Sequence, residues 1–135
     1  MINYKLETTS TSHFTSAIAA NGTTPEIETF PGLRGDGLGE ITSICIESME
    51  NLDWQVELMN QSYAVKEKVL FEASHATEYT ISGVKKYYYS ATDLNIPVPF
   101  EGGYDTVLVG LRNMSTTAKT AGTAGALTVT LVVQK

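Results

Sequence analysis

The side chains that could act as nucleophiles or bases are few and far apart. The single cysteine, Cys45, lies in the apolar stretch 41–46, where a buried and unreactive thiol is the usual outcome. The two histidines, His13 and His75, stand in a Ser/Thr-rich segment and in a Ser-His-Ala stretch. None of the short motifs of serine hydrolases, zinc peptidases or thiol oxidoreductases occurs. We therefore predict that the protein is not an enzyme; the alternative requires residues distant in sequence to converge in the fold.

Carboxylates are the second group of side chains that could form a functional site, because clustered Asp and Glu oxygens in loops bind Ca²⁺. Two groups of them are close in sequence: Glu47, Glu50, Asp53 and Glu57, and then Asp93, Glu101 and Asp105. Neither group has the Asp-x-Asp-x-Asp-Gly spacing of a calcium-binding loop. We interpret both as solvated surface carboxylates, and we predict no metal ion and no cofactor.

Three consecutive tyrosines, Tyr87, Tyr88 and Tyr89, are the most unusual local feature. Successive side chains of a strand point to opposite faces, so Tyr87 and Tyr89 share one face and Tyr88 takes the other. An outward tyrosine offers a large contact area for recognition, although tyrosine also packs well across neighbouring strands. Both interpretations stay open, and the first makes Tyr88 a candidate interaction residue.

The composition excludes some classes of partner. The chain has 135 residues, the usual size of one domain, with 9 basic and 15 acidic residues and a net charge of −6. Nucleic-acid-binding proteins need a basic surface to neutralise phosphates, so we predict no direct contact with nucleic acid. No stretch approaches the roughly 20 apolar residues that cross a bilayer, so we also predict no membrane segment. Charged residues make up only 18%, which leaves more of the surface available for packing against neighbours.

The elements that must position these residues are strands. Seven segments have the apolar-polar alternation or the β-favouring composition of strands: residues 41–48, 54–60, 65–71, 77–81, 85–91, 104–113 and 127–133. Turn-forming residues separate them, among them Ser82-Gly83, Pro97 and the Ser/Thr/Gly-rich stretch 115–125. We therefore predict an all-β fold, an antiparallel two-sheet jelly-roll-like β-sandwich over residues 38–135 with an irregular N-terminal arm.

The alternation also predicts the core of this sandwich. On three of the segments the apolar residues recur at every second position, which places them on one face of each strand. The residues expected to be buried are Trp54, Val56, Leu58, Val107, Val109, Leu111, Val129 and Leu131.

Residues 1–37 differ from the rest, because they are rich in Ser, Thr, Gly and Pro and show no sustained period. Short apolar pieces at 2–6, 14–18 and 27–30 can form one or two edge strands or a helical turn. The segment as a whole is either an irregular lead-in or an arm that becomes ordered only against a neighbouring subunit. The arm has seven apolar anchors: Ile2, Tyr4, Leu6, Phe14, Ile18, Ile27 and Phe30. Together with Tyr88 these anchors are the candidate interaction surface.

Seven anchors are too few to order the arm by themselves. Burial of one such side chain contributes roughly 1.5–3 kcal/mol, whereas ordering the backbone costs about 1–2 kcal/mol for every residue. The arm must therefore take backbone hydrogen bonds from a sheet edge or a neighbouring subunit. We expect deletion of residues 1–35 to leave a folded domain that no longer attaches to its partner; loss of folding would instead place the segment in the sandwich.

Four segments in the second half carry a family resemblance: LDWQVEL (52–58), LNIPVPF (94–100), VLVGLRNMS (107–115) and AKTAGTAG (118–125). Their succession resembles small jelly-roll proteins of tailed-bacteriophage virions, of the kind that decorate or cement a capsid. The resemblance covers roughly residues 40–135, and residues 1–37 have no counterpart in it.

The resemblance implies a structural virion protein on the capsid surface, made in the host cytoplasm. Its expected partners are the major capsid protein or another virion protein, and its expected assembly is a trimer or another small homo-oligomer. Two alternatives stay open. A neck or tail component of the same virion would have the same composition, and a carbohydrate-binding jelly roll would use exposed aromatic residues beside carboxylates, such as Trp54 with Asp53.

Overall fold

A computed structural model describes residues 7–14, 18, 28–30, 39–98, 100, 107–115 and 127–134, and for 7–13, 28–30 and 134 the backbone alone. These residues form strands and one short 3-10 turn, and none of them forms a helix that is long and apolar enough to cross a membrane. The elements are β1 (Glu7–His13), β2 (Glu28–Phe30), β3 (Gly39–Ser48), β4 (Trp54–Met59), β5 (Val65–Phe71), η1 (Ala73–His75), β6 (Thr77–Ile81), β7 (Val84–Ala91), β8 (Ile96–Val98), β9 (Val107–Asn113) and β10 (Leu127–Gln134).

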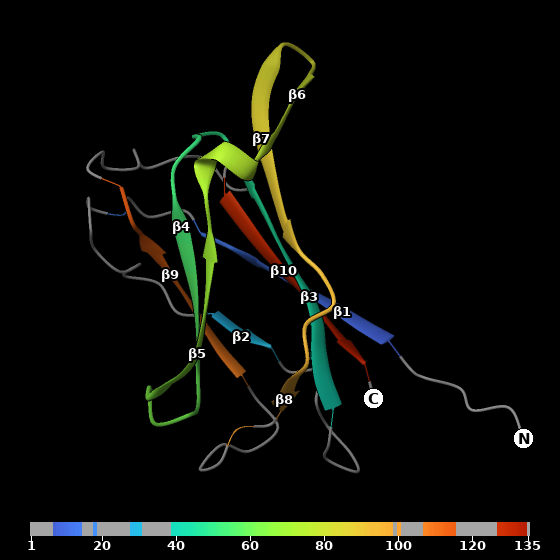
Figure 1. Cartoon of the computed structure of the whole chain (residues 1–135), viewed down its shortest axis with the longest axis vertical. Helices are drawn as coiled ribbons and strands as arrows, with labels where there is room; N and C mark the ends of the chain where they lie inside the picture. The colour runs from blue at the N-terminus through green and yellow to red at the C-terminus, as the bar shows by residue number, and fades with distance from the viewer. Residues whose placement is uncertain are drawn as a thin grey trace, which may run out of the picture.

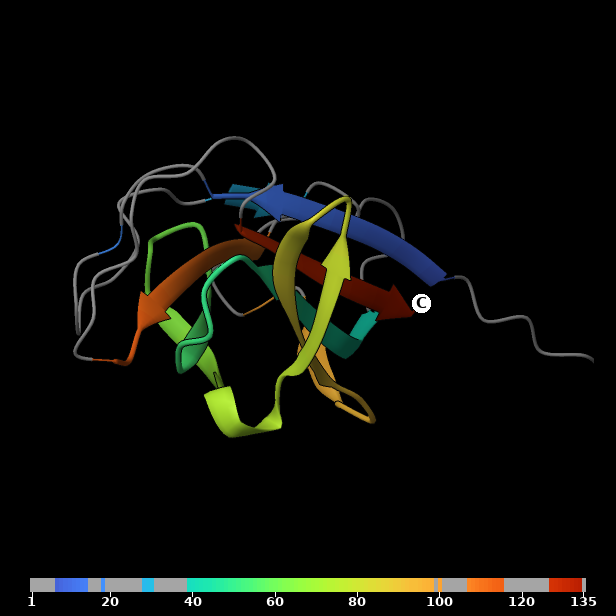
Figure 2. The same ribbon diagram turned by 90° about the horizontal axis from the view of Figure 1, so that it is seen from above.

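The strands form two antiparallel sheets, which confirms the predicted all-β sandwich (Figure 1). One sheet has the order β1-β10-β3-β7-β6, with β8 also paired to β3, and the other has the order β2-β9-β4-β5. Figure 2 shows from above how β1 and β10 run alongside each other. All seven strands expected from the sequence are present, with ends shifted by up to three residues.

The strand pairs are nested along the chain. β1 pairs with β10, β2 with β9, β3 with β7, and β4 with β5. A long hairpin folded over on itself into two sheets has this pattern, which is the jelly-roll arrangement. β6 and β8 are additions to the eight nested strands. The jelly roll therefore includes two strands from residues 1–37.

The described residues of the predicted arm belong to the sandwich. Strand β1 pairs with β10 over seven residues, from Glu7 opposite Gln134 to His13 opposite Thr128, and the ladder continues with a hydrogen bond from Phe14 N to Leu127 O (2.9 Å). Phe14 and Ile18 are fully buried in the core. The segment thus takes backbone hydrogen bonds from a sheet edge, as predicted, and that edge belongs to its own chain. Four of the proposed anchors, Ile2, Tyr4, Leu6 and Ile27, lie outside the described residues, and Phe30 is described only by its backbone in β2.

The predicted core is confirmed. Each of the eight residues named above is at most 1% exposed, and they pack with Ile44, Ile46 and Tyr89 in one cluster between the sheets. The same alternation turns Cys45 and Glu47 of β3 to the outer face of the six-stranded sheet, which is why these two residues remain partly accessible.

A β-bulge at Thr42 explains a break in the alternation of β3. Ile41 and Ile44 are three residues apart and are both fully buried, although strict alternation would put them on opposite faces. The register with β10 passes from Ser43 opposite Val132 to Ile41 opposite Val133, so Thr42 is the extra residue. Its carbonyl accepts a hydrogen bond from Leu94 N (2.9 Å), which ties the chain ahead of β8 to the bulge.

Strand β8 lies where the sequence predicted only a break. Ile96 and Val98 are buried while Pro97 between them is exposed, opposite Glu40 of β3. Proline cannot donate to a ladder and is tolerated where its nitrogen faces away from the partner strand. The apolar residues on either side of Pro97 nevertheless fill the core.

We predict that Val109→Asp abolishes folding. Val109 is fully buried on the inner face of β9, and an unpaired carboxylate there costs several kcal/mol, a large part of the stability of a small domain. Val65→Asp is the matched control, because Val65 of the edge strand β5 is 41% exposed. Circular dichroism melting curves check the prediction; a native-like curve for Val109→Asp would refute the core assignment.

The structure changes the expected result of removing residues 1–35. Deletion uncovers one edge of β10 and removes Phe14 and Ile18 from the core, so we now expect the truncated chain to lose its cooperative unfolding transition. The single substitution Phe14→Ala should lower the free energy of unfolding by about 3–5 kcal/mol. Denaturant titration of both variants tests this, and an unchanged midpoint for Phe14→Ala would place the segment outside the core.

Candidate functional site

The β6–β7 hairpin extends the six-stranded sheet beyond the core of the sandwich (Figure 1). Its two-residue turn has positive φ at Ser82 (51°) and at Gly83 (79°), the combination found in type I′ turns, whose twist matches that of the flanking strands. Most residues of both strands are exposed. The hairpin therefore presents side chains to solvent from a regular backbone.

One face of this hairpin is apolar and aromatic. Directly opposed residues share a face of an antiparallel pair, which groups Ile81 with Val84, Tyr79 with Lys86, and Tyr88 with Glu47 of β3. We call this set, together with Cys45, the hairpin face. Three of its apolar side chains are exposed: Ile81 (56%), Val84 (39%) and Tyr88 (39%). Exposed apolar residues gathered on one surface are typical of a binding site.

Three hydrogen-bonded polar side chains, Glu47, Tyr79 and Lys86, lie at the centre of the hairpin face. Lys86 Nζ lies 3.0 Å from Glu47 Oε1, and both side chains are only partly exposed. Hydrogen bonds from Tyr79 and then from Lys86 lower the pKa of Glu47. Partial burial and the hydrogen bond to Glu47 raise the pKa of Tyr79 to about 12. At neutral pH Glu47 is thus ionised and accepts hydrogen bonds from Tyr79 and Lys86, which links side chains of β3, β6 and β7.

Tyr88 leans across β3. Its hydroxyl lies 2.9 Å from Cys45 Sγ, and this contact is the main cause that raises the pKa of Tyr88 to about 12, together with partial burial. The phenol therefore stays neutral at ordinary pH, and 39% of the side chain is exposed to solvent. Such a ring suits recognition by contact area rather than proton transfer.

The three tyrosines alternate as the sequence predicted. Tyr88 faces outward, whereas Tyr89 is buried and stacks edge-on against Phe71, with ring centroids 6.5 Å apart. The Tyr89 hydroxyl accepts a hydrogen bond from Leu52 N (3.1 Å) and lies 2.9 Å from Leu52 O, so it anchors the connection between β3 and β4. Strand β7 thus buries Tyr89 in the core and presents the candidate residue Tyr88 at the surface.

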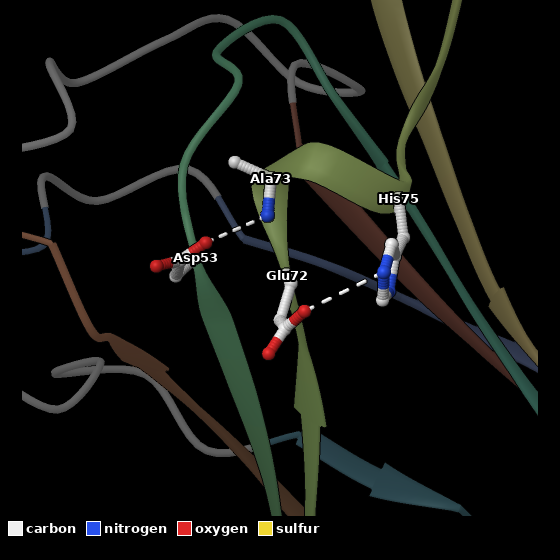
Figure 3. A network of polar contacts seen from close by, with 4 residues as sticks. All are labelled: Asp53, Glu72, Ala73 and His75. Carbon is white, nitrogen blue, oxygen red and sulfur yellow. Dashed lines mark hydrogen bonds and ion pairs between the residues drawn. The ribbon is translucent and has the colours of Figure 1, made fainter.

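Two carboxylates, the sequence candidate Asp53 and Glu72, each make one polar contact near η1 (Figure 3). Asp53 Oδ1 accepts a hydrogen bond from Ala73 N (2.6 Å), and Glu72 Oε2 lies 3.5 Å from His75 Nε2 on the exposed side of the turn. The hollow beside them, lined partly by His75 and Tyr89, has a volume of about 70 Å³, far below the roughly 300–1,000 Å³ of small-molecule sites. These contacts therefore shape the turn rather than a ligand pocket.

Other sequence candidates are placed as follows. Within the described ranges no three His, Cys, Asp or Glu side chains gather as metal ligands, and Glu101 and Asp105 lie outside those ranges. Trp54 is fully buried, so its ring cannot stack on a sugar beside Asp53. Phe14 and Ile18 are buried in the core. Among the candidates whose side chains the structure describes, Tyr88 is the exposed one.

Sequence reasoning did not single out Tyr79, Ile81 and Val84 as interaction residues. A signal for two of them was present in Ile81-Ser82-Gly83-Val84, where apolar residues flank a two-residue turn. Hairpin tips often lie beyond the core, and apolar residues there tend to remain uncovered.

Comparison with protein-family models, with curated proteins and with solved structures finds no match.

We predict that Glu47→Gln lowers stability at neutral pH and has little effect in acid. The folded-state pKa of Glu47 lies below its ordinary value of 4.5, so its contribution is present above that value and is lost as the pH falls through the folded pKa. The pair is partly solvated, so the difference at pH 7 should stay below about 1 kcal/mol. Urea titrations of both proteins at about pH 7 and about pH 2 measure it; equal differences at both values would contradict the assigned ionisation.

Proposed function

We propose that this chain is a structural virion protein that decorates or cements a capsid and binds its lattice through the hairpin face. The observation that carries the proposal is the exposure of Ile81, Val84 and Tyr88 together on a projecting hairpin. Interfaces form around such apolar and aromatic residues, because their burial stabilises a complex and little conformational freedom is lost.

The rest of the fold supports a binding role. The hairpin continues strands that are anchored in the core through Tyr89, so its outer face is held in one geometry before a partner arrives, which reduces the entropy lost on binding. Glu47 and Lys86 lie at the centre of the hairpin face and supply charged groups that can orient the partner.

The virion context comes from the family resemblance over roughly residues 40–135, and the jelly-roll topology is compatible with it. A fold alone does not assign a function, since jelly rolls also serve as lectins and cupins. In the proposed role the partner is the major capsid protein or another virion protein, and the chain is located on the capsid surface.

The location is tested by electron cryomicroscopy of particles that were assembled in the presence of this chain. Density for the sandwich on the capsid surface is the expected result. Density at the neck or tail would replace the decoration role with that of a connector component, and particles without the chain would refute the proposal.

The docking surface is tested with a matched pair of variants. Ile81→Asp should reduce binding to undecorated particles at least tenfold, because a charge replaces an apolar contact at the interface. Leu70→Asp is the control, because Leu70 lies on β5 of the other sheet and is 53% exposed, close to the 56% of Ile81. Cosedimentation with particles measures both, and equal loss or equal retention of binding would show that the hairpin face is not the site.

A further inference from the structure

Strand β6 is the last strand of its sheet, and its outer edge is open. It pairs with β7 on one side, and the described residues place no strand on its other side. Four of its five residues, Thr77, Glu78, Thr80 and Ile81, are exposed. An open edge offers unpaired backbone N–H and C=O groups to another strand.

This edge lacks lysine, proline and bulges, which usually prevent pairing between sheets, and Glu78 is its one charged residue. Proteins protect edge strands with lysine, proline or bulges. Edge strand β5 of the other sheet has Lys66 and Lys68, and the register with β4 shifts at Lys66. Strand β6 contains no lysine, proline or glycine, and its five pairs with β7 follow one another without a shift. Its pairing with β7 is therefore regular enough for the open edge to act as a template.

The turn determines which backbone groups point outward. In a two-residue hairpin the residues that flank the turn, here Ile81 and Val84, form a hydrogen-bonded pair, and the pairs then alternate. Ile81, Tyr79 and Thr77 thus direct their N–H and C=O groups toward β7. Glu78 and Thr80 direct theirs toward the open edge.

The open edge is complementary to itself. If a second copy pairs antiparallel about a two-fold axis at Tyr79, each Glu78 lies opposite Thr80 of the second copy. Both residues carry outward backbone groups, so the two pairs form four hydrogen bonds. An axis at Glu78 would oppose two carboxylates, and an axis at Thr80 would leave Thr77 beyond the end of the ladder.

We propose that β6 binds β6 of a second copy of this chain in that register and joins the two six-stranded sheets into one. The two Tyr79 rings then meet across the axis on the outer face, and Ile81 of each copy lies opposite Thr77 of the other. The two-fold symmetry makes the contact close on itself, so it yields a pair of subunits rather than a filament.

Five residues per copy bury less surface than the roughly 1,200 Å² of a stable complex. The association should therefore depend on concentration, and it should be strongest where copies are held close together. The inference does not rest on the proposed function, because the backbone edge of β6 carries it, although Tyr79 and Ile81 of the hairpin face lie beside the contact.

Disulfide trapping tests the register. In a Cys45→Ser background, Tyr79→Cys should form a covalent dimer under mild oxidation, because residues at a non-hydrogen-bonded pair have Cα atoms about 4.5 Å apart, within the range of a disulfide. Lys68→Cys in the same background is the control on the exposed edge strand β5 and should remain monomeric. No excess of dimer for Tyr79→Cys over Lys68→Cys would overturn the proposal.

A pair of charge variants separates pairing from folding. Thr80→Glu places a carboxylate opposite Glu78 of the second copy and should raise the dissociation constant on the order of tenfold in sedimentation equilibrium. Thr80→Lys places a cation there and should preserve association. Within one chain Thr80 lies opposite Lys85. Thr80→Glu should therefore raise the melting temperature and Thr80→Lys should lower it, which is the opposite of their effects on association. A trimer that neither variant affects, or a monomer at all concentrations, would refute the pairing.

Discussion

The structure depends on the antiparallel pairing of β1 with β10, which joins residues from the two ends of the chain. β10 lies between β1 and β3, and its inner side chains Leu127, Val129 and Leu131 are fully buried. The larger sheet is therefore complete only after both ends of the chain have met. Such contacts carry the largest loop-closure cost and are expected to form late in folding.

The β6–β7 hairpin, by contrast, is formed by residues that are close in sequence. Its two strands are joined by a two-residue turn and pair locally, so the hairpin needs little from the rest of the chain to adopt its shape. Its position, however, comes from the pairing of β7 with β3 and from Tyr89 in the core. The same strand turns Tyr88 outward. Core and candidate site are thus coupled through the alternation of one strand, and loosening Tyr89 would also displace Tyr88.

Much of the fold could be predicted because alternating apolar residues report directly on burial. Trp54, Val109 and Leu131 were recognisable in this way, and all three are buried. β1 was not recognisable, because Glu-Thr-Thr-Ser-Thr-Ser-His has no apolar alternation and is a strand only through its pairing with β10. β8 was missed because proline usually interrupts a strand. Ile81 and Val84 were missed because the local pattern marks the turn between them but not whether the tip of the hairpin is covered by the rest of the fold.

The sequence by itself determined the β class, the core alternation and the outward position of Tyr88, because each of these depends on the spacing of residues within one strand. Tertiary structure alone decided that Phe14 and Ile18 belong to the core and that β1 and β2 complete the jelly roll. It also decided that β6 ends its sheet and that Glu47 meets Tyr79 and Lys86. These features depend on which strands become neighbours, and that choice is made by burial over the whole chain rather than by any local segment.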